Sequence, residues 1–337
     1  MRENKESWPD ENQMAPRERL SLNGVWDFRG ERDDAWSKVR VPGCYTGVRK
    51  GWGGEQWDGF DYPGRWEDRG GVYRRTFLLP ESMRGREVRF RCEACAHHTT
   101  VLVNGRTVGA WHDGYTPMEF SITAALTDGE NLIEVQVAAR KNDLFDDYGT
   151  YRRGMWQGCC LRAYPELCVE DDLFIVTSHS RGEIRCEIPV RNLSDAERHF
   201  SIDCRVREAG GVEVKRFGLE GLRLDAGGWR EAALSTPWSD PHLWFPHDPH
   251  LYELHILIRG ESGAVVDRRG QRFGFREMTW RGPHLYINGR ELFLRGHGGH
   301  YLGDIQGSRE YMETWLGGMK KVGINFMRLH DSPKHAA

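Results

Sequence analysis

Residues 100–108 of the chain are TVLVNGRTV, two short runs rich in β-branched residues on either side of an Asn-Gly dipeptide at 104–105. Asn and Gly both tolerate a positive φ, which the tight type I′ turn of a β-hairpin demands. Residues 72–79, VYRRTFLL, and 131–138, NLIEVQVA, have the same strand-like character and are bounded by turn residues. Long helical periodicity is missing throughout this region. We therefore expect residues 20–168 to form a β-sandwich of the jelly-roll type.

A second run of short strands follows at residues 169–270, again without helical periodicity. Frequent turns between short strands are typical of an immunoglobulin-like sandwich. The Cys…Trp…Cys arrangement of antibody domains is not evident, so the prediction concerns the architecture only. Cys186 and Cys204 each fall on the apolar face of an alternating strand, which predicts that both thiols fill the core as small hydrophobic groups.

The pattern changes after residue 270. Residues 285–292, LYINGREL, predict another Asn-Gly hairpin, and residues 324–329, INFMRL, a buried-type strand. Between them Ser308 is a good helix N-cap, and Gly323 is a residue common just past a helix end. Apolar residues recur between them at helical spacing, at Met312, Trp315, Leu316, Met319 and Val322. A strand, a helix and a strand with short connections predict a βαβ unit, which builds a parallel sheet.

Composition excludes several classes of function. Lys plus Arg number 47 against 50 Asp plus Glu, without a long run of one sign, so neither nucleic acid nor a membrane surface is expected as a partner. Thirteen Trp and 40 Gly suit an all-β protein with large loops, which often bind sugars. Residues 1–19 are a polar tail without the apolar segment of a secretory signal. Eight Cys in 337 residues are not a disulfide framework, so a reduced, cytoplasmic setting is expected.

Several short motifs resemble those of glycoside hydrolase family 2, and they occur in the order of its domains. The motifs are LNGVWDF (22–28), VPG (41–43), VYRRTF (72–77), VNGRTVG (103–109) and GYTPMEF (114–120), then WSDPHLW (238–244) with LY (251–252), and finally FGFRE (273–277), ING (287–289) and LRG (294–296). The family usually has Phe where this chain has Met118. Because the motifs span nearly the whole chain, the resemblance implies a sugar-binding domain, an immunoglobulin-like domain and, over residues 271–337, the start of a (β/α)₈ barrel.

The resemblance implies a retaining exo-glycosidase of the β-galactosidase, β-glucuronidase and β-mannosidase group, which hydrolyses O-glycosyl bonds without a cofactor or a metal. Retaining chemistry needs two carboxyl groups close together. In the family two glutamates on later barrel strands supply them, and the acid/base glutamate follows an Asn. This sequence contains no Asn-Glu pair. A complete barrel needs about 250 residues. We therefore expect residues 1–337 to lack both catalytic glutamates and to be inactive alone, as part of an enzyme whose full-length form can be a homo-oligomer.

Three residues near barrel strand ends are candidate substrate-binding residues, because such ends carry the active sites of these barrels. His300 follows Arg295 by five residues, the spacing of a sugar-site His in the family; the alternative is a loop histidine in a Gly-rich turn. Arg328 matches a family Arg that can orient the nucleophilic carboxylate; the alternative is a structural Arg on the barrel rim. His330 stands one position before the usual His, where this chain has Asp331, so it is the weaker candidate.

Other constellations favour structural interpretations. Cys92 and Cys95 lie beside two histidines, but residues three apart in a strand point to opposite faces and could not share a metal ion. The aromatic loop at residues 52–62 could stack on sugar rings or pack against a core or a subunit. The acidic turn at 143–147 is typical of solvated loop charges.

A second class of function is a self-standing carbohydrate-binding or adhesive β-sandwich protein. The region from residue 293 to 333 separates the two hypotheses, because a binding module has no use for a single βα unit whose strand ends at Arg328. Such a unit is how an enzyme barrel begins.

Overall fold

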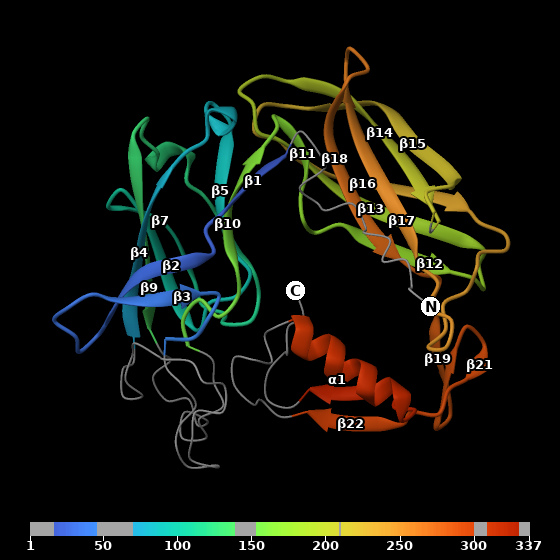
Figure 1. Cartoon of the computed structure of the whole chain (residues 1–337). Helices are drawn as coiled ribbons and strands as arrows, with labels where there is room; N and C mark the ends of the chain where they lie inside the picture. The colour runs from blue at the N-terminus through green and yellow to red at the C-terminus, as the bar shows by residue number, and fades with distance from the viewer. Residues whose placement is uncertain (1–16, 46–69, 139–152, 209, 300–308, 330–337) are drawn as a thin grey trace. The chain divides into compact units, whose positions relative to one another are not determined.

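A computed structural model of the chain describes residues 17–45, 70–138, 153–208, 210–299 and 309–329 (Figure 1). These residues divide into two compact units. One unit joins Ala163–Phe293 to the segment that ends at Glu18, and the other joins Arg19–Arg162 to Leu294–Ala337. Each unit therefore combines pieces that are distant in the sequence.

The sandwich predicted for residues 20–168 consists of two sheets. One has six antiparallel strands in the order β3-β2-β4-β9-β6-β7, and the other has four strands in the order β1-β10-β5-β8. The elements are β1 (Glu18–Ser21), β2 (Gly24–Gly30), β3 (Ser37–Val41), β4 (Gly70–Leu78), η2 (Glu81–Met83), β5 (Glu87–Cys92), β6 (His98–Val103), β7 (Arg106–Trp111), β8 (Met118–Ser121), η3 (Thr123–Ala125), β9 (Glu130–Ala138) and β10 (Cys159–Tyr164).

Alternation along β2 shows how the motif at residues 22–28 builds this core. Trp26 and Phe28 are buried, whereas Val25, directly before Trp26, is exposed. The indole N–H of Trp26 donates to the carbonyl of Leu22 at 2.8 Å, so its one polar group is satisfied inside the core. Phe28 packs edge-on against Tyr73 of β4, with ring centroids 4.8 Å apart. The motif therefore supplies a buried aromatic cluster to the six-stranded sheet.

The hairpin predicted at residues 100–108 is confirmed. Asn104 and Gly105 have φ values of 51° and 77°, and Val103 pairs with Arg106 across the two-residue turn. Asn104 does more than turn the chain, because its side-chain amide accepts from the N–H of Leu132 at 2.9 Å and donates to Asn131 at 2.8 Å. The turn is thus fastened to β9, the neighbouring strand of the same sheet.

The immunoglobulin-like sandwich has β13 paired with β12, β11 and β16 in one sheet and the order β15-β14-β17-β18 in the other, all antiparallel. Cys186 and Cys204 are fully buried in the core between the sheets, as their alternation predicted. The strands are β11 (Leu167–Val169), β12 (Phe174–Ser178), β13 (Glu183–Asn192), β14 (Arg198–Arg207), β15 (Glu213–Leu224), β16 (Trp229–Pro237), β17 (Tyr252–Gly260) and β18 (Val265–Phe273).

Arg17 fastens the N-terminal segment to this sandwich. Its guanidinium forms a two-pronged ion pair with Asp267 of β18, at 2.9 and 2.7 Å, and donates to the carbonyl of Val169 in β11. The Asp267 carboxylate is fully buried and also accepts from the N–H of Val169 at 2.8 Å. The ion pair therefore satisfies a buried charge, and Arg17, expected within a polar tail, belongs to the packed structure.

A small antiparallel sheet follows the immunoglobulin-like sandwich and consists of β19 (Met278–Arg281), β20 (His284–Ile287) and β21 (Arg290–Glu291). A second Asn-Gly turn connects β20 to β21 and attaches this sheet to the sandwich through the side chain of Asn288. Asn288 has a φ of 48° and is buried. Its side-chain amide donates to the carbonyls of Trp244 and Phe275 and accepts from the N–H of Glu277. One side chain thus holds the end of the sandwich, a loop and the hairpin together.

The carboxylate of Glu277 closes the other side of this junction. It accepts from the hydroxyl of Ser180 at 2.6 Å, from the N–H of Ser180 and from the hydroxyl of Ser178. These hydrogen bonds, first of all that from the Ser180 hydroxyl, lower the pKa of Glu277 below its usual value. An ionised Glu277 is therefore part of the folded junction.

The predicted βαβ unit is present as β22 (Gly296–Gly299), α1 (Arg309–Lys321) and β23 (Phe326–Leu329), with β22 and β23 parallel. Gly323 ends the helix as predicted, with a φ of 80°. Its N–H donates to the carbonyl of Lys320, and the N–H of Ile324 donates to that of Met319, which is the hydrogen-bond pattern of a Schellman motif. Ser308, the expected N-cap, lies outside the described residues.

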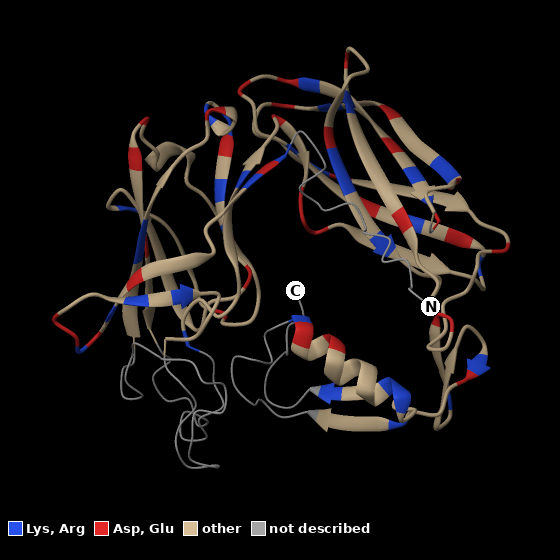
Figure 2. Cartoon of the chain, viewed as in Figure 1, with Lys and Arg blue, Asp and Glu red and all other residues tan. Residues whose placement is uncertain are grey.

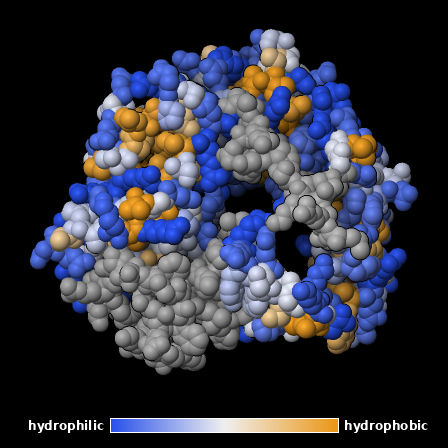
Figure 3. Space-filling model, in the orientation of Figure 1, coloured by the Kyte–Doolittle hydropathy of each residue, from blue (hydrophilic) through white to orange (hydrophobic). Residues whose placement is uncertain are grey.

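Residues of both charge signs are interspersed along the ribbon of both sandwiches (Figure 2). Apolar groups form separate patches in a mostly hydrophilic surface in the view of Figure 3. Several exposed apolar side chains belong to the C-terminal segments, namely Phe293, Leu294, Leu316, Val322 and Phe326. None of the helices in the described ranges is long and apolar enough to cross a membrane.

Candidate functional site

Arg328 lies on β23, where it pairs with Gly298 of β22. The ring of His297 meets Trp315 of α1 edge-on, with centroids 5.9 Å apart, so His297 points toward the helix. Because side chains alternate along a strand, Gly298 and its partner Arg328 occupy the face turned away from the helix. In a barrel that face is the interior. The position of Arg328 is therefore the one that an active-site residue of such a barrel would have.

The strand β23 was predicted from its apolar residues to be buried, but it is partly exposed. Phe326, on the same face as Arg328, is 47% exposed. Arg328 is itself exposed, and no carboxylate among the described residues is paired with it. Within the described part of the chain, Phe326 is therefore only partly covered on this face.

The opposite ends of β22 and β23 are fastened by Arg295 and Asn325. The side chain of Arg295 donates to the carbonyl of Gly323 at 2.6 Å, and its N–H donates to the side chain of Asn325 at 2.8 Å. The N–H of Asn325 returns a hydrogen bond to the carbonyl of Arg295 at 3.1 Å. Arg295 thus fixes the register of the two strands at their N-terminal ends.

His300 and His330 lie outside the described residues. In sequence they immediately follow Gly299 and Leu329, the last residues of β22 and β23. The loop at 52–62 and the acidic turn at 143–147 also fall outside. Of the three candidate site residues, only Arg328 has a described position.

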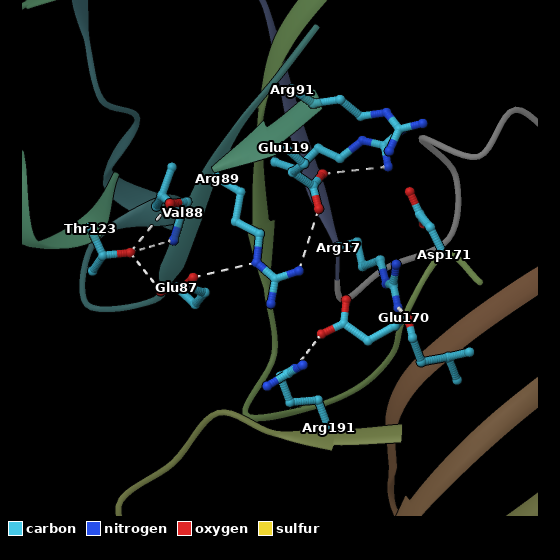
Figure 4. A network of polar contacts seen from close by, with 12 residues as sticks. Arg17, Glu87, Val88, Arg89, Arg91, Glu119, Thr123, Glu170, Asp171 and Arg191 are labelled. Carbon is cyan, nitrogen blue, oxygen red and sulfur yellow. Dashed lines mark hydrogen bonds and ion pairs between the residues drawn. The ribbon is translucent and has the colours of Figure 1, made fainter. Parts of the chain in front are cut away.

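A network of Arg and Glu side chains lies on β5 and β8, and sequence reasoning had not singled it out. Figure 4 shows Arg89 between Glu87 and Glu119, at 3.4 and 3.3 Å. Arg91 pairs with Glu93 at 2.7 Å. Each carboxylate already faces a guanidinium, so this is a structural network and not a carboxylate pair free for acid–base catalysis. The signal in the sequence is the alternation of charged residues in EVRFRCE at 87–93.

The two thiols of Cys92 and Cys95 do not form a reactive site. The strand β5 ends at Cys92, so strand alternation does not apply to Cys95, and that part of our sequence argument was wrong. Both thiols are buried and free. Burial raises the pKa of Cys95 to about 12, which keeps this thiol protonated at neutral pH. No cluster of metal-binding side chains occurs within the described ranges.

A cavity of about 460 Å³ lies on the immunoglobulin-like sandwich, beside the edge strand β12. Its walls include Phe174, Trp244, Leu251 and Phe273, with Arg276 as its one charged lining residue. The guanidinium of Arg276 lies over the Trp244 ring, 5.2 Å from its centroid. Its lining contains no Asp, Glu, His, Lys, Tyr or Cys, which are the side chains that act as general acids and bases.

Two family models match the chain. The model of glycosyl hydrolases family 2 matches residues 169–276, and that of the sugar binding domain of family 2 matches residues 60–157. The chain belongs to glycosyl hydrolase family 2. The matches cover the two sandwiches in the predicted order, and neither reaches the βαβ unit.

Relatives of this family 2 chain include a β-galactosidase of Priestia megaterium, which is 25% identical over 93% of the chain and 34% of its own length. A β-glucuronidase of Paenibacillus borealis is 23% identical over 86% of the chain and 51% of its own length. Among solved structures, the Bacteroides uniformis β-glucuronidase has a TM-score of 0.80 at 23% identity and aligns with 95% of the chain, which is 40% of its own. The chain thus spans about a third of the first of these relatives and about half of the second.

Proposed function

We propose that this chain is the N-terminal part of a retaining exo-β-glycosidase that removes terminal sugars such as galactose or glucuronic acid. The proposal rests on one observation above others: after two family 2 sandwiches, the chain forms a βαβ unit whose second strand carries Arg328 near its C-terminal end, on the face turned away from α1. Residues 271–337 are then the first part of a (β/α)₈ barrel, following a sugar-binding domain at 20–168 and an immunoglobulin-like domain at 169–270.

In this proposal the chain's own residues bind and orient, and the two catalytic glutamates come from later barrel strands outside residues 1–337. A guanidinium at Arg328 can hold a carboxylate in a two-pronged geometry and keep it ionised as the nucleophile. His300 and His330 follow the same two strands in sequence and would contact the sugar. Eight buried, free cysteines support a reducing, cytoplasmic setting.

The test begins with the gene downstream of codon 337. If it continues in frame, the longer protein is expressed and assayed on nitrophenyl β-galactoside, β-glucuronide and β-mannoside. We expect hydrolysis of at least one substrate, with the first-formed product in the β configuration by NMR. A longer protein that binds oligosaccharides but hydrolyses none would favour the binding-module hypothesis. Product of inverted configuration would contradict the retaining mechanism.

A further inference from the structure

Three arginines on the outer face of the sheet β15-β14-β17-β18 surround one carboxylate. Arg205 of β14 donates to Asp203 at 2.9 and 3.1 Å, and Arg216 of β15 does so at 2.8 and 3.0 Å. Arg259 of β17 reaches the same carboxylate at 3.4 Å. We name these three arginines, together with Asp203, the arginine face.

The arginine face carries more positive charge than its carboxylate can balance. Arg205 and Arg216 are direct cross-strand partners, a placement that is unfavourable for like charges. Each guanidinium has five N–H donors, and the bonds to Asp203 use only part of them. Arg216 is 58% exposed, so its remaining donors are available to a ligand in solution. The arginine face therefore has positively charged N–H donors that are not used by Asp203.

The residue opposite Asp203 on β15 is a glycine. Gly218 of β15 is the cross-strand partner of Asp203, and a Cβ there would lie 2.2 Å from the carbonyl oxygen of Ile202. No other side chain can occupy this position without moving the backbone. The position between Arg205 and Arg216 on this face therefore carries no side chain.

We infer that the arginine face binds acidic polysaccharide through the carboxylates of uronic acid residues. The three guanidiniums already bind one planar carboxylate, that of Asp203, so their geometry suits a second. One guanidinium contact per sugar gives little affinity, and an extended polymer that spans several strands compensates through multivalency. This inference rests on the proposed function, since a glycosidase of acidic glycans gains from a second anchor on its polymer.

Nucleic acid is the less suitable polyanion. The chain carries a formal net charge of −3, whereas nucleic-acid-binding domains are usually basic. Single strands are held largely by stacking of bases on aromatic side chains. One ring neighbours the arginine face, the imidazole of His255 opposite Arg205, whereas its other cross-strand neighbours Gly218 and Leu257 carry none. Charge complementarity with a single small ring among these neighbours favours an acidic glycan.

The test uses the whole 337-residue chain in affinity electrophoresis through gels containing polygalacturonate, neutral galactan or no polymer. We expect retardation by polygalacturonate that weakens as salt is raised, and none by galactan. Loss of one charge-assisted contact in Arg216→Gln should weaken binding about tenfold. Arg216→Lys, which keeps the charge but loses the planar fork, should weaken it less, and Arg259→Gln should weaken it as Arg216→Gln does.

Arg185→Gln is the matched control, because Arg185 lies on β13 of the other sheet, is 53% exposed and also pairs with a carboxylate. It should leave binding unchanged, and melting curves show whether each variant is folded. Equal retardation by galactan, equal loss in Arg185→Gln, or tighter binding of a DNA oligonucleotide than of polygalacturonate would each overturn the inference. Since no turnover is measured, this outcome is independent of the proposed hydrolase activity.

Discussion

Arg17 and Arg328 show what two environments do to the same side chain. Arg17 is enclosed with a fully buried carboxylate, whereas Arg328 is exposed on a strand face without a carboxylate partner in the described part of the chain. The sequence singled out Arg328 as a candidate, because a charge after an apolar strand is conspicuous in a local pattern. It could not identify Arg17, whose partner Asp267 lies 250 residues away.

We expect Arg17→Ala to destabilise the immunoglobulin-like sandwich by about 3–5 kcal/mol, because it leaves the Asp267 carboxylate buried without a counter-charge. Thermal or urea unfolding of the whole chain measures the loss. Adding Asp267→Asn should recover part of it by removing the buried charge. Arg198→Ala, which breaks an exposed pair with Glu166, should cost at most about 1 kcal/mol. Similar losses in both arginine variants would contradict a special role for the buried pair.

In the longer enzyme, Arg328→Lys should lower turnover about 100-fold or more, the scale seen when a preorganised electrostatic partner is removed. The reason is that Lys cannot reproduce the two-pronged hold on a carboxylate. Steady-state kinetics on the best nitrophenyl glycoside gives the number, with circular dichroism as a check on folding. A folded variant with near-wild-type turnover would mean that Arg328 is a structural residue of the rim.

At the scale of elements, both Asn-Gly turns perform two tasks. Asn104 and Asn288 adopt positive φ, which the dipeptide predicted, and both side chains also bind the backbone of a neighbouring segment. The pattern of two residues cannot reveal these second bonds, because the hydrogen-bond partners are set by tertiary packing. The hairpins were thus predictable from sequence, but their attachment to the surrounding fold was not.

The two tasks can be separated at Asn288. Asn288→Gly keeps a residue that accepts positive φ but removes the buried amide, leaving the carbonyls of Trp244 and Phe275 and the N–H of Glu277 without this partner. We expect a loss of at least about 2 kcal/mol in the free energy of unfolding, given the cost of unsatisfied buried polar groups. If Asn288 served the turn alone, the Gly variant would unfold at the same denaturant concentration as the parent chain.

The loop between β16 and β17 should make the sandwich sensitive to mild acid. His242 and His250 stack with ring centroids 4.0 Å apart, and Nε2 of His250 is buried without a hydrogen-bond partner. Burial, and next the charge of His242, lower the pKa of His250 below its usual 6.5, although Glu208 and Asp248 act in the opposite direction. The unfolded chain therefore takes up a proton near pH 6.5 that the folded chain resists, and stability falls as pH falls.

We expect the melting temperature to decrease between pH 7.5 and 5.5, and His250→Phe, which keeps a ring but cannot titrate, to reduce that decrease. The exposed His284, replaced by Gln, provides the control and should leave the pH profile as it is. A His250→Phe profile that parallels the parent would assign the sensitivity to other groups.

At the scale of the whole molecule, we expect the 337-residue chain to hydrolyse no aryl β-glycoside above background, because it contains no Asn-Glu pair to supply the family's acid/base residue. Purified protein is assayed on nitrophenyl galactoside, glucuronide and mannoside, with the longer enzyme as positive control. Turnover that persists through repeated purification would show that carboxylates within residues 1–337 catalyse the reaction.

The order of the two sandwiches and the βαβ unit was predictable, because strand alternation, Asn-Gly turns and helical spacing are local signals. The composition of the compact units was not. Residues up to Glu18 join Ala163–Phe293, and the strand β10 passes from one unit to the other between Arg162 and Ala163. Such discontinuity follows from contacts between distant segments, and patterns among neighbouring residues carry no information about those contacts.

The order of synthesis determines when the ion pair of Arg17 can form. Asp267 is made 250 residues after Arg17, so at ribosomal rates of about 5–20 residues per second the N-terminal segment waits roughly 10–50 seconds for its partner. The whole of residues 20–162 emerges in that interval and can fold while Arg17 is still solvated. Arg17 is therefore among the last of the described residues to reach its native contacts. Until Asp267 has been synthesised, the guanidinium of Arg17 stays accessible to other molecules.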